Sequence, residues 1–183
     1  MTTANKVTLA RIAMIPVFMA VVYSNRRYSD LIALIIFATA GITDSVDGYI
    51  ARKYNQVSDF GKFMDPMADK LLVFSALLVF VERGQMPGWA AMSILTREFA
   101  VTSLRLVAVE GGVVLAAGTS GKIKTAVSIV GICFMLTPMN GFLLSPRFNF
   151  SVNDAAVWLM VIATIWSGVE YFYTNRNLLN MSK

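Results

Sequence analysis

Six apolar segments alternate with short polar turns along the chain, and each is long enough to cross a bilayer. A membrane-spanning helix needs about 20 mostly apolar residues. The segments cover residues 7–24, 31–53, 60–82, 88–110, 122–144 and 152–174. Their polar interruptions gather mostly near one end of each segment, which indicates one polar side. We therefore predict an all-α integral membrane protein of six transmembrane helices with a short amphipathic start, in one domain over residues 1–183.

The amino-acid composition agrees with a membrane protein. Of the 183 residues, 56% are hydrophobic and 15% are charged, whereas soluble domains carry about a quarter charged residues. The chain contains no histidine, which excludes His-ligated zinc, a histidine general base and Ser-His-Asp catalysis. Its one cysteine, Cys133, can form no internal disulfide. Carboxylates, Lys, Tyr and Cys are left for acid–base chemistry.

The distribution of Lys and Arg predicts the orientation. The formal net charge is +5, but the basic residues are dispersed along the chain. A nucleic-acid-binding protein would concentrate them on one face or stripe. Anionic lipid headgroups explain the dispersed charges better. With the N-terminus inside, only Arg26, Arg27, Arg83 and Arg147 of the 16 basic residues fall outside, which favours a multi-pass cell-membrane protein with cytoplasmic termini and a cytoplasmic site.

A signal peptide is the alternative for the first segment, but polar residues at helical spacing favour a retained helix.

Four motif aspartates lie close together at the joint between the second and third segments. Residues 44–69 hold five of the 11 acidic residues, with Asp59 as the fifth. On helices, Asp44 and Asp47 are i and i+3, and Asp65 and Asp69 are i and i+4, so each pair shares a face. Unpaired carboxylates are costly near hydrocarbon, and hard divalent cations prefer oxygen ligands. The pattern predicts a divalent-metal site. Two metal ions about 3.5–4 Å apart would form the clamp used for displacement at phosphorus.

The third helix can begin in two registers. If it begins near Ser58, then Gly61, Asp65 and Asp69 share one face, and Pro66 falls in the early helix. Alternatively, Asp65 caps the helix and Pro66 takes its first position. Both registers keep Asp65 and Asp69 neighbours.

Small residues accompany the carboxylates. Gly48, Ala51 and Gly61 leave the helix faces open, so that a polyphosphate can approach closely. Arg52 offers a bidentate donor to a phosphate oxygen. A cluster of salt bridges would leave these small residues unexplained. A cation transporter that uses the aspartates as ion relays fits the residue types and stays open on them alone.

The motif resembles the signature of the CDP-alcohol phosphotransferases. The pattern Asp-x2-Asp-Gly-x2-Ala-Arg-x8-Gly-x3-Asp-x3-Asp fills residues 44–69 with all eight defined positions matched. Similarity to one branch of that family covers nearly the whole chain. It includes Asn5-Lys-Val-Thr8, Ala68-Asp69-Lys70, Arg97-Glu98-Phe99, Gly121-Lys122-Ile-Lys124-Thr125 and Trp166-Ser167-Gly-x-Glu170-Tyr171.

The resemblance implies a fold and a reaction. The fold would have six transmembrane helices, usually in a homodimer, with a cytoplasm-facing polar cavity. A CDP-linked donor would be joined to an alcohol acceptor with release of CMP. For this branch, the donor would be CDP-diacylglycerol and the acceptor sn-glycerol 3-phosphate. Inositol phosphate, serine and phosphatidylglycerol are alternative acceptors within the family.

The resemblance also implies roles for individual residues. Asp44, Asp47 and Asp65 would ligate metal, and Asp69 would serve both the second metal and the acceptor hydroxyl as general base. The metals would be two Mg²⁺ ions, with Mn²⁺ as an alternative. The residues expected at the nucleotide are Asn5, Thr8, Asp47, Gly48, Ala51, Arg52, Ser58 and Gly61.

A phosphorylated acceptor needs cations, and the fourth and fifth segments supply four. These residues are Arg97, Arg105, Lys122 and Lys124. Arg97 and Arg105 are i and i+8, about 12 Å apart along one helix face, and only one of the two lysines can share that face closely. Alternatively, Arg97 pairs with a carboxylate such as Glu98 or Glu110, or the lysines only mark the cytoplasmic boundary.

Overall fold

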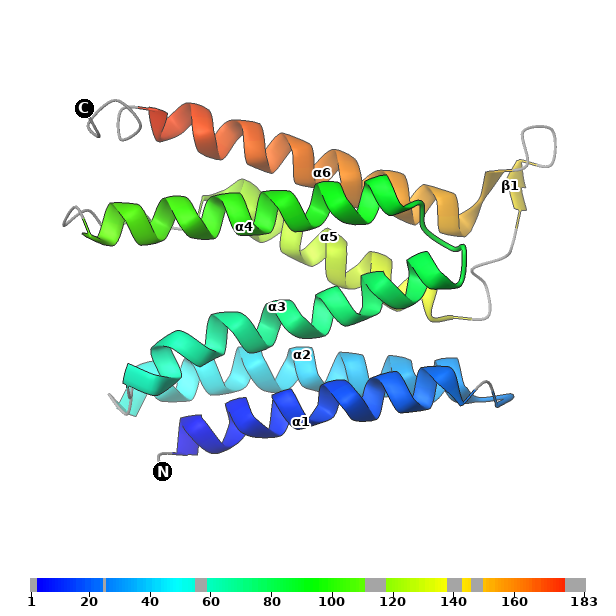
Figure 1. The fold of residues 1–183 in the computed structure, drawn as a ribbon, viewed down its shortest axis with the longest axis horizontal. Coiled ribbons are helices and arrows are strands. Elements are labelled where there is room, and N and C mark those ends of the chain that lie inside the picture. The colour runs from blue at the N-terminus through cyan, green and yellow to red at the C-terminus, as the bar shows by residue number, and fades with distance from the viewer. Residues whose placement is uncertain are drawn as a thin grey trace. The chain divides into compact units, whose positions relative to one another are not determined.

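A helix occupies each of the six predicted segments. The computed structural model describes residues 3–24, 26–54, 59–110, 118–137, 143–145 and 150–176. In chain order, the helices are α1 (Thr3–Tyr23), α2 (Ser29–Tyr54), α3 (Asp59–Glu82), α4 (Gly88–Glu110), α5 (Thr119–Met135) and α6 (Val152–Thr174) (Figure 1). The predicted helical architecture is therefore confirmed for the described part of the chain.

The helices fall into two compact units. The first unit contains α1, α2 and α3, and the second contains α4, α5 and α6. This division leaves the prediction of a single domain untested, and each unit is described by itself.

In the first unit, α1 packs against both α2 and α3. The contact is aromatic in part, since the ring centroids of Phe18 in α1 and Phe37 in α2 lie 6.2 Å apart. Phe80 of α3 is fully buried as well. The Tyr23 hydroxyl donates to the carboxylate of Glu82 and joins the end of α1 to the end of α3. Three helices therefore hold the half of the chain that carries the aspartate motif.

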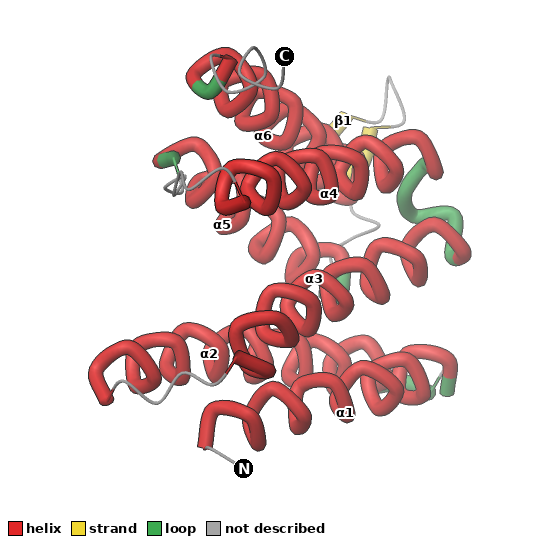
Figure 2. The backbone as a smooth tube through the Cα atoms, turned by 60° about the vertical axis from the view of Figure 1, so that its left-hand side comes forward, coloured by secondary structure: helices red, strands yellow, loops and turns green. Residues whose placement is uncertain are grey.

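In the second unit, α6 packs against both α4 and α5 (Figure 2). The α5–α6 contact is close because α5 presents a glycine to it. A Cβ on Gly131 would lie 2.8 Å from the Met160 Sδ, and Met160 is fully buried. Small residues of this kind let two helix backbones approach each other.

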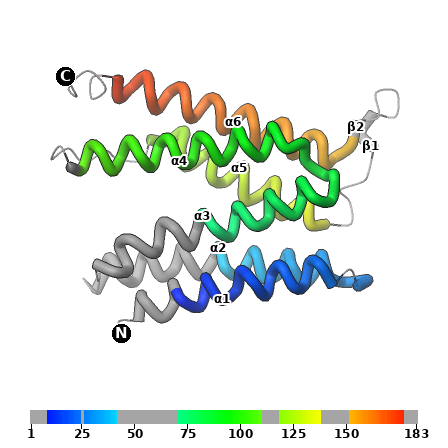
Figure 3. The backbone as a smooth tube through the Cα atoms, viewed as in Figure 1, coloured from blue at the N-terminus to red at the C-terminus, as the bar shows by residue number. Residues whose placement is uncertain are grey.

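A short antiparallel ribbon precedes α6, and the all-helical prediction missed it. Strand β1 (Leu143–Ser145) pairs with β2 (Phe150–Ser151) (Figure 1). The ribbon leads into α6, which lies beside α4 (Figure 3). Ser151 also begins α6, because its hydroxyl accepts from the Asp154 N–H while the Asp154 carboxylate accepts from the Ser151 N–H. This reciprocal capping box satisfies two N–H groups that the helix leaves unpaired.

Two predicted helix boundaries need correction. The helix predicted over 122–144 ends at Met135, and β1 occupies residues 143–145. Pro138 supplies the reason, since proline lacks an N–H and biases the preceding residue away from helical geometry. The alternative in which Asp65 caps the third helix is wrong, because α3 already begins at Asp59.

Among the described residues, α6 alone is long and apolar enough to cross a membrane. Two shorter apolar stretches, Leu9–Tyr23 and Ser29–Gly41, belong to α1 and α2. Charged residues such as Arg97, Glu98 and Arg105 interrupt α4. In the described ranges the structure thus contains six helices, and α6 has the length and apolar character of a transmembrane span.

Gly131→Ala tests the close α5–α6 approach. In a helix interior, alanine is more stable than glycine by about 1 kcal/mol. At position 131, however, the alanine Cβ would push into the buried Met160 side chain. Overpacking of this kind costs about 1–3 kcal/mol. The matched control is Gly41→Ala in α2, where an added Cβ meets nothing within 4 Å. Thermal unfolding in detergent should place Gly131→Ala below Gly41→Ala in stability. Equal melting temperatures would contradict the described contact.

Candidate functional site

The aspartate motif is divided between two helices of the first unit. Asp44 and Asp47 belong to α2, and Asp65 and Asp69 belong to α3. The two helices contact each other, and helical spacing places each pair on one face. The side chains of residues 42–69 lie outside the described part of the chain. The meeting of the two aspartate pairs therefore stays a prediction.

The predicted nucleotide-binding residues also fall in this half of the chain. Their side chains lie outside the described part as well, and Ser58 lies outside it altogether. By helix, Asn5 and Thr8 belong to α1, Gly48, Ala51 and Arg52 to α2, and Gly61 to α3.

A polar network, which we call the Glu98 network, connects the three helices of the second unit. One carboxylate oxygen, Glu98 Oε1 on α4, accepts a hydrogen bond from Arg97 Nη1 at 3.0 Å. The same oxygen accepts from Lys124 Nζ on α5 at 2.7 Å. Arg97 Nη2 also donates to the hydroxyl of Ser167 on α6. Lys124 is only 3% exposed and Ser167 is fully buried. These four residues form an interior polar contact that joins the three helices of the unit.

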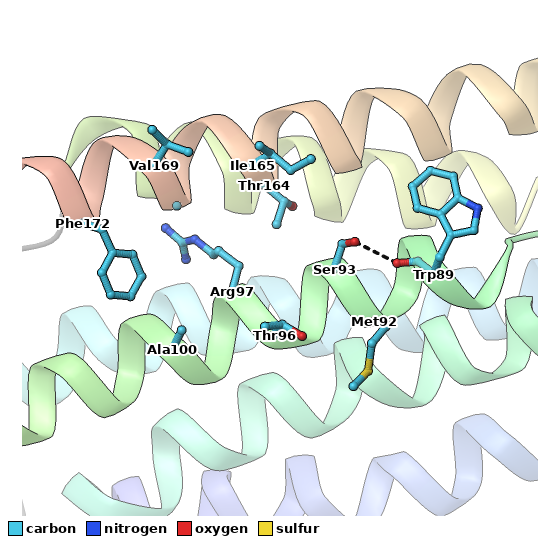
Figure 4. Close-up of a pocket in the computed structure, with 11 residues that line it drawn as sticks. Trp89, Met92, Ser93, Thr96, Arg97, Ala100, Thr164, Ile165, Val169 and Phe172 are labelled. Carbon is cyan, nitrogen blue, oxygen red and sulfur yellow. Dashed lines mark hydrogen bonds between the residues drawn. The ribbon is translucent and has the colours of Figure 1, made fainter.

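Gly168 leaves room for the Arg97 side chain, whereas a side chain at Gly121 would make only an ordinary contact with it. A Cβ on Gly168 would lie 3.2 Å from Arg97 Cγ, and one on Gly121 would lie 3.7 Å from Arg97 Nη2. The side chain extends from α4 toward α6 (Figure 4). Its Nε is buried without a hydrogen-bond partner in the described part of the chain. An unpaired buried donor on a charged group is costly, so this position favours an additional acceptor.

The two lysines of α5 lie in different surroundings. Burial of Lys124 is tolerable because its ammonium has a counter-charge in contact, whereas an unpaired buried charge costs several kcal/mol. Lys124 is therefore held inside the second unit by this ion pair, and its role toward an acceptor stays a prediction. Lys122 is exposed, which agrees with the expectation that only one lysine shares the face of α4. The alternative pairing of Arg97 with Glu98 is confirmed.

The second arginine of α4 also reaches α6. Arg105 Nε donates to the Tyr171 hydroxyl at 3.2 Å, and its guanidinium carbon lies 5.6 Å from the centre of the Tyr171 ring. Tyr171 is buried and packs with Val101 and Leu104. Since Arg97 and Arg105 both bind residues of α6, the predicted shared face is confirmed.

An open apolar cavity of about 490 Å³ lies between α4 and α6, beside the Glu98 network. Among the described residues that line it, Arg97 alone is charged. The lining consists of Trp89, Met92, Ser93, Thr96, Arg97, Ala100, Thr164, Ile165, Gly168, Val169 and Phe172.

Sequence reasoning missed the α6 partners of both arginines. Ser167 and Tyr171 are i and i+4 on one helix face, and they receive hydrogen bonds from Arg97 and Arg105. Two polar groups one turn apart in an apolar helix were a usable signal. It identifies a helix face that needs donors, although it does not identify the helix that supplies them.

Comparison with known proteins identifies the family. A family model described as CDP-alcohol phosphatidyltransferase matches residues 1–166. The chain belongs to this family, and the resemblance seen in the aspartate motif is confirmed.

Similar proteins come from several bacteria. The CDP-diacylglycerol–glycerol-3-phosphate 3-phosphatidyltransferase of Bacillus subtilis is 43% identical and aligns over 97% of both chains. A probable phosphatidylglycerophosphate synthase of Mycobacterium tuberculosis is 41% identical over 92% of this chain and 78% of its own length. A Rickettsia bellii protein with the same name as the Bacillus relative is 34% identical over 92% of both chains.

Tyr171→Phe tests the Arg105 contact. The substitution removes the hydroxyl that accepts from Arg105 but keeps the ring beneath the guanidinium, so it should cost about 1 kcal/mol of unfolding free energy. Tyr171→Leu should cost more, because the ring is lost too. The control is Tyr173→Phe, where the ring is 68% exposed and the effect should stay within about 0.5 kcal/mol. Denaturation in detergent checks the order, and equal stability of the two Phe variants would argue against the contact.

Proposed function

We propose that this chain transfers the phosphatidyl group from CDP-diacylglycerol to sn-glycerol 3-phosphate, giving phosphatidylglycerophosphate and CMP. Membership of the CDP-alcohol phosphatidyltransferase family supports a CDP-linked donor. The names of relatives that are 34–43% identical support this donor and this acceptor. The observation that carries the proposal is the complete eight-position motif at residues 44–69 in a chain of that family.

The donor set fits hard divalent cations. Asp44, Asp47, Asp65 and Asp69 offer only oxygen ligands, and they lie in two contacting helices with each pair on one face by its spacing. They would hold two Mg²⁺ ions, with Mn²⁺ as the alternative. When bound, the metals would neutralise the pyrophosphate and the charge that develops on the departing CMP.

Asp69 takes the proton in this proposal. The acceptor hydroxyl oxygen forms a bond to the lipid-side phosphorus of the donor, and the bond from that phosphorus to the oxygen of CMP breaks. The hydroxyl proton passes to the Asp69 carboxylate, which is a natural base in a chain without histidine.

The nucleotide would meet small and polar residues of α1, α2 and α3. Gly48, Ala51 and Gly61 leave space for the diphosphate, and Arg52 donates to one of its oxygens. The side chains of Asn5, Thr8 and Ser58 complete the proposed cytidine diphosphate site.

The acceptor phosphate would bind cations of the second unit. The proposed residues are Arg97, Arg105, Lys122 and Lys124. Lys124 and Arg97 are supported most, since both are largely buried and held by one carboxylate. An acceptor without a phosphate would leave such cations without an anionic ligand.

The proposed setting is the cell membrane, with six membrane-crossing helices, cytoplasmic termini and a cytoplasmic active site. The apolar span of α6 supports a membrane location. Large apolar side chains are exposed on the same helix, among them Trp158, Leu159, Ile162, Ile165 and Val169, as expected of a surface in lipid. A homodimer stays a prediction.

Two other functions compete with the proposal. Another member of the family could use inositol phosphate, serine or phosphatidylglycerol as acceptor. A cation transporter would use the aspartates as ion relays, and would move ions without releasing CMP.

A CMP-release assay distinguishes all three functions. The purified protein in detergent receives CDP-diacylglycerol, Mg²⁺ and one acceptor from a panel. CMP should form with glycerol 3-phosphate, and should stop when the donor, the acceptor or the metal is left out or chelated. CMP release that requires a different acceptor would reassign the substrate. Ion flux with no CMP would overturn the enzymatic proposal.

Asp69→Asn tests the proposed base. The amide keeps the shape but cannot accept the hydroxyl proton, so turnover should fall by about 10²–10⁴-fold, while binding of CDP-diacylglycerol persists. The matched control is Asp30→Asn at the start of α2, which should keep near-normal turnover. Single-turnover CMP release and donor binding are the measurements. Near-wild-type turnover of Asp69→Asn would remove the base role.

A further inference from the structure

Glu98 places a negative charge among the cations that we propose to bind the phosphate of the acceptor. A carboxylate so close to a phosphate site repels the ligand, so its presence needs a positive explanation. The carboxylate is only 17% exposed, and it is shared by residues on two helices. A surface ion pair of little consequence does not fit these observations.

The geometry gives Glu98 a specific task. Arg97 Nη1 and Lys124 Nζ both bond to the single oxygen Oε1, at 3.0 and 2.7 Å. The two cationic nitrogens can therefore lie no farther apart than the two bond lengths together, close enough for one phosphate group to contact both. Their mutual repulsion would separate them if the carboxylate were absent.

Donors remain available after these bonds form. An ammonium has three N–H donors and a guanidinium has five. In the described part of the chain, Lys124 Nζ donates to Glu98, and Arg97 Nε is buried without a hydrogen-bond partner. Two cations held by one carboxylate also keep a net positive charge. The arrangement suits a phosphate monoester better than a neutral alcohol.

We propose that Glu98 is a positioning residue for the acceptor: it holds Arg97 and Lys124 together so that both bind the acceptor's phosphate monoester. This inference rests on the function proposed above and deepens it. Glu98 acts through the two cations and need not touch the substrate.

Separate Michaelis constants for the two substrates test the inference. Glu98→Gln keeps an oxygen that can accept a hydrogen bond but removes the charge that anchors both cations. The KM for glycerol 3-phosphate should rise by about 10-fold or more, as expected for loss of a charged hydrogen bond. The KM for CDP-diacylglycerol should stay within about 2-fold. Glu98→Asp, which keeps the charge on a shorter side chain, should restore part of the acceptor affinity.

A double substitution separates positioning from general damage. If Glu98 acts through Lys124, then Glu98→Gln in a Lys124→Gln background should add much less than its effect in the wild type. The matched control is Glu170→Gln on α6, an exposed carboxylate in the same unit, which should leave both KM values unchanged. Melting temperatures of all variants identify any loss of folding, and Glu98→Asp serves as the test variant if Glu98→Gln does not fold.

The outcomes distinguish this inference from the proposed function. If the wild type releases no CMP with glycerol 3-phosphate, the proposed function is wrong, and the inference about Glu98, which rests on it, is wrong too. If the wild type is active but Glu98→Gln leaves the acceptor KM unchanged, only the inference is overturned. Parallel changes in both KM values, or full additivity with Lys124→Gln, would assign Glu98 a merely structural role and overturn it as well.

Discussion

The need to pair every charge that sits among apolar helices organises this protein. Lys124 can be buried because Glu98 contacts it at 2.7 Å, and the guanidinium of Arg105 lies against the ring and hydroxyl of Tyr171. An unpaired charge in such surroundings would cost several kcal/mol. The same constraint applies to the four motif aspartates of α2 and α3, since a cluster of salt bridges to the neighbouring cations would leave the small residues of the motif unexplained. Divalent metal is the economical counter-charge for four carboxylates.

Small residues let this pairing take place. Gly168 leaves the volume that the Arg97 side chain fills, and Gly131 lets α5 approach α6. Arg97 can then reach Ser167 of α6 while it and Lys124 of α5 both bond to the Glu98 carboxylate. In the aspartate motif, Gly48 and Gly61 are proposed to do the same for a bound diphosphate. Both halves of the chain would thus combine clustered charges with glycine. The first unit would use carboxylates to bind divalent cations, and the second would use cations to bind an anionic acceptor.

Periodicity and length predicted most of the helices well, because most of the apolar segments end at a clear polar turn. The turn between α3 and α4, where Gly84 has a φ of 69°, is one example. The end of α5 was mistaken because the apolar run continues past Pro138, so hydropathy alone did not reveal the break. The aspartate motif was recognisable since its information lies in local spacing. The pairing of Glu98 with Lys124 was not, because it joins residues on different helices and depends on how α4 and α5 pack.

In this account the motif carboxylates together hold two divalent cations. Because Mn²⁺ is paramagnetic, its binding at this site can be measured directly. Electron paramagnetic resonance of the purified protein with Mn²⁺ and CDP-diacylglycerol should reveal two bound ions per chain with the magnetic coupling of a pair about 3.5–4 Å apart. Replacing Asp47 and Asp65 by asparagine should abolish that coupled signal. A single uncoupled ion, or an unchanged spectrum in the substituted protein, would contradict the account.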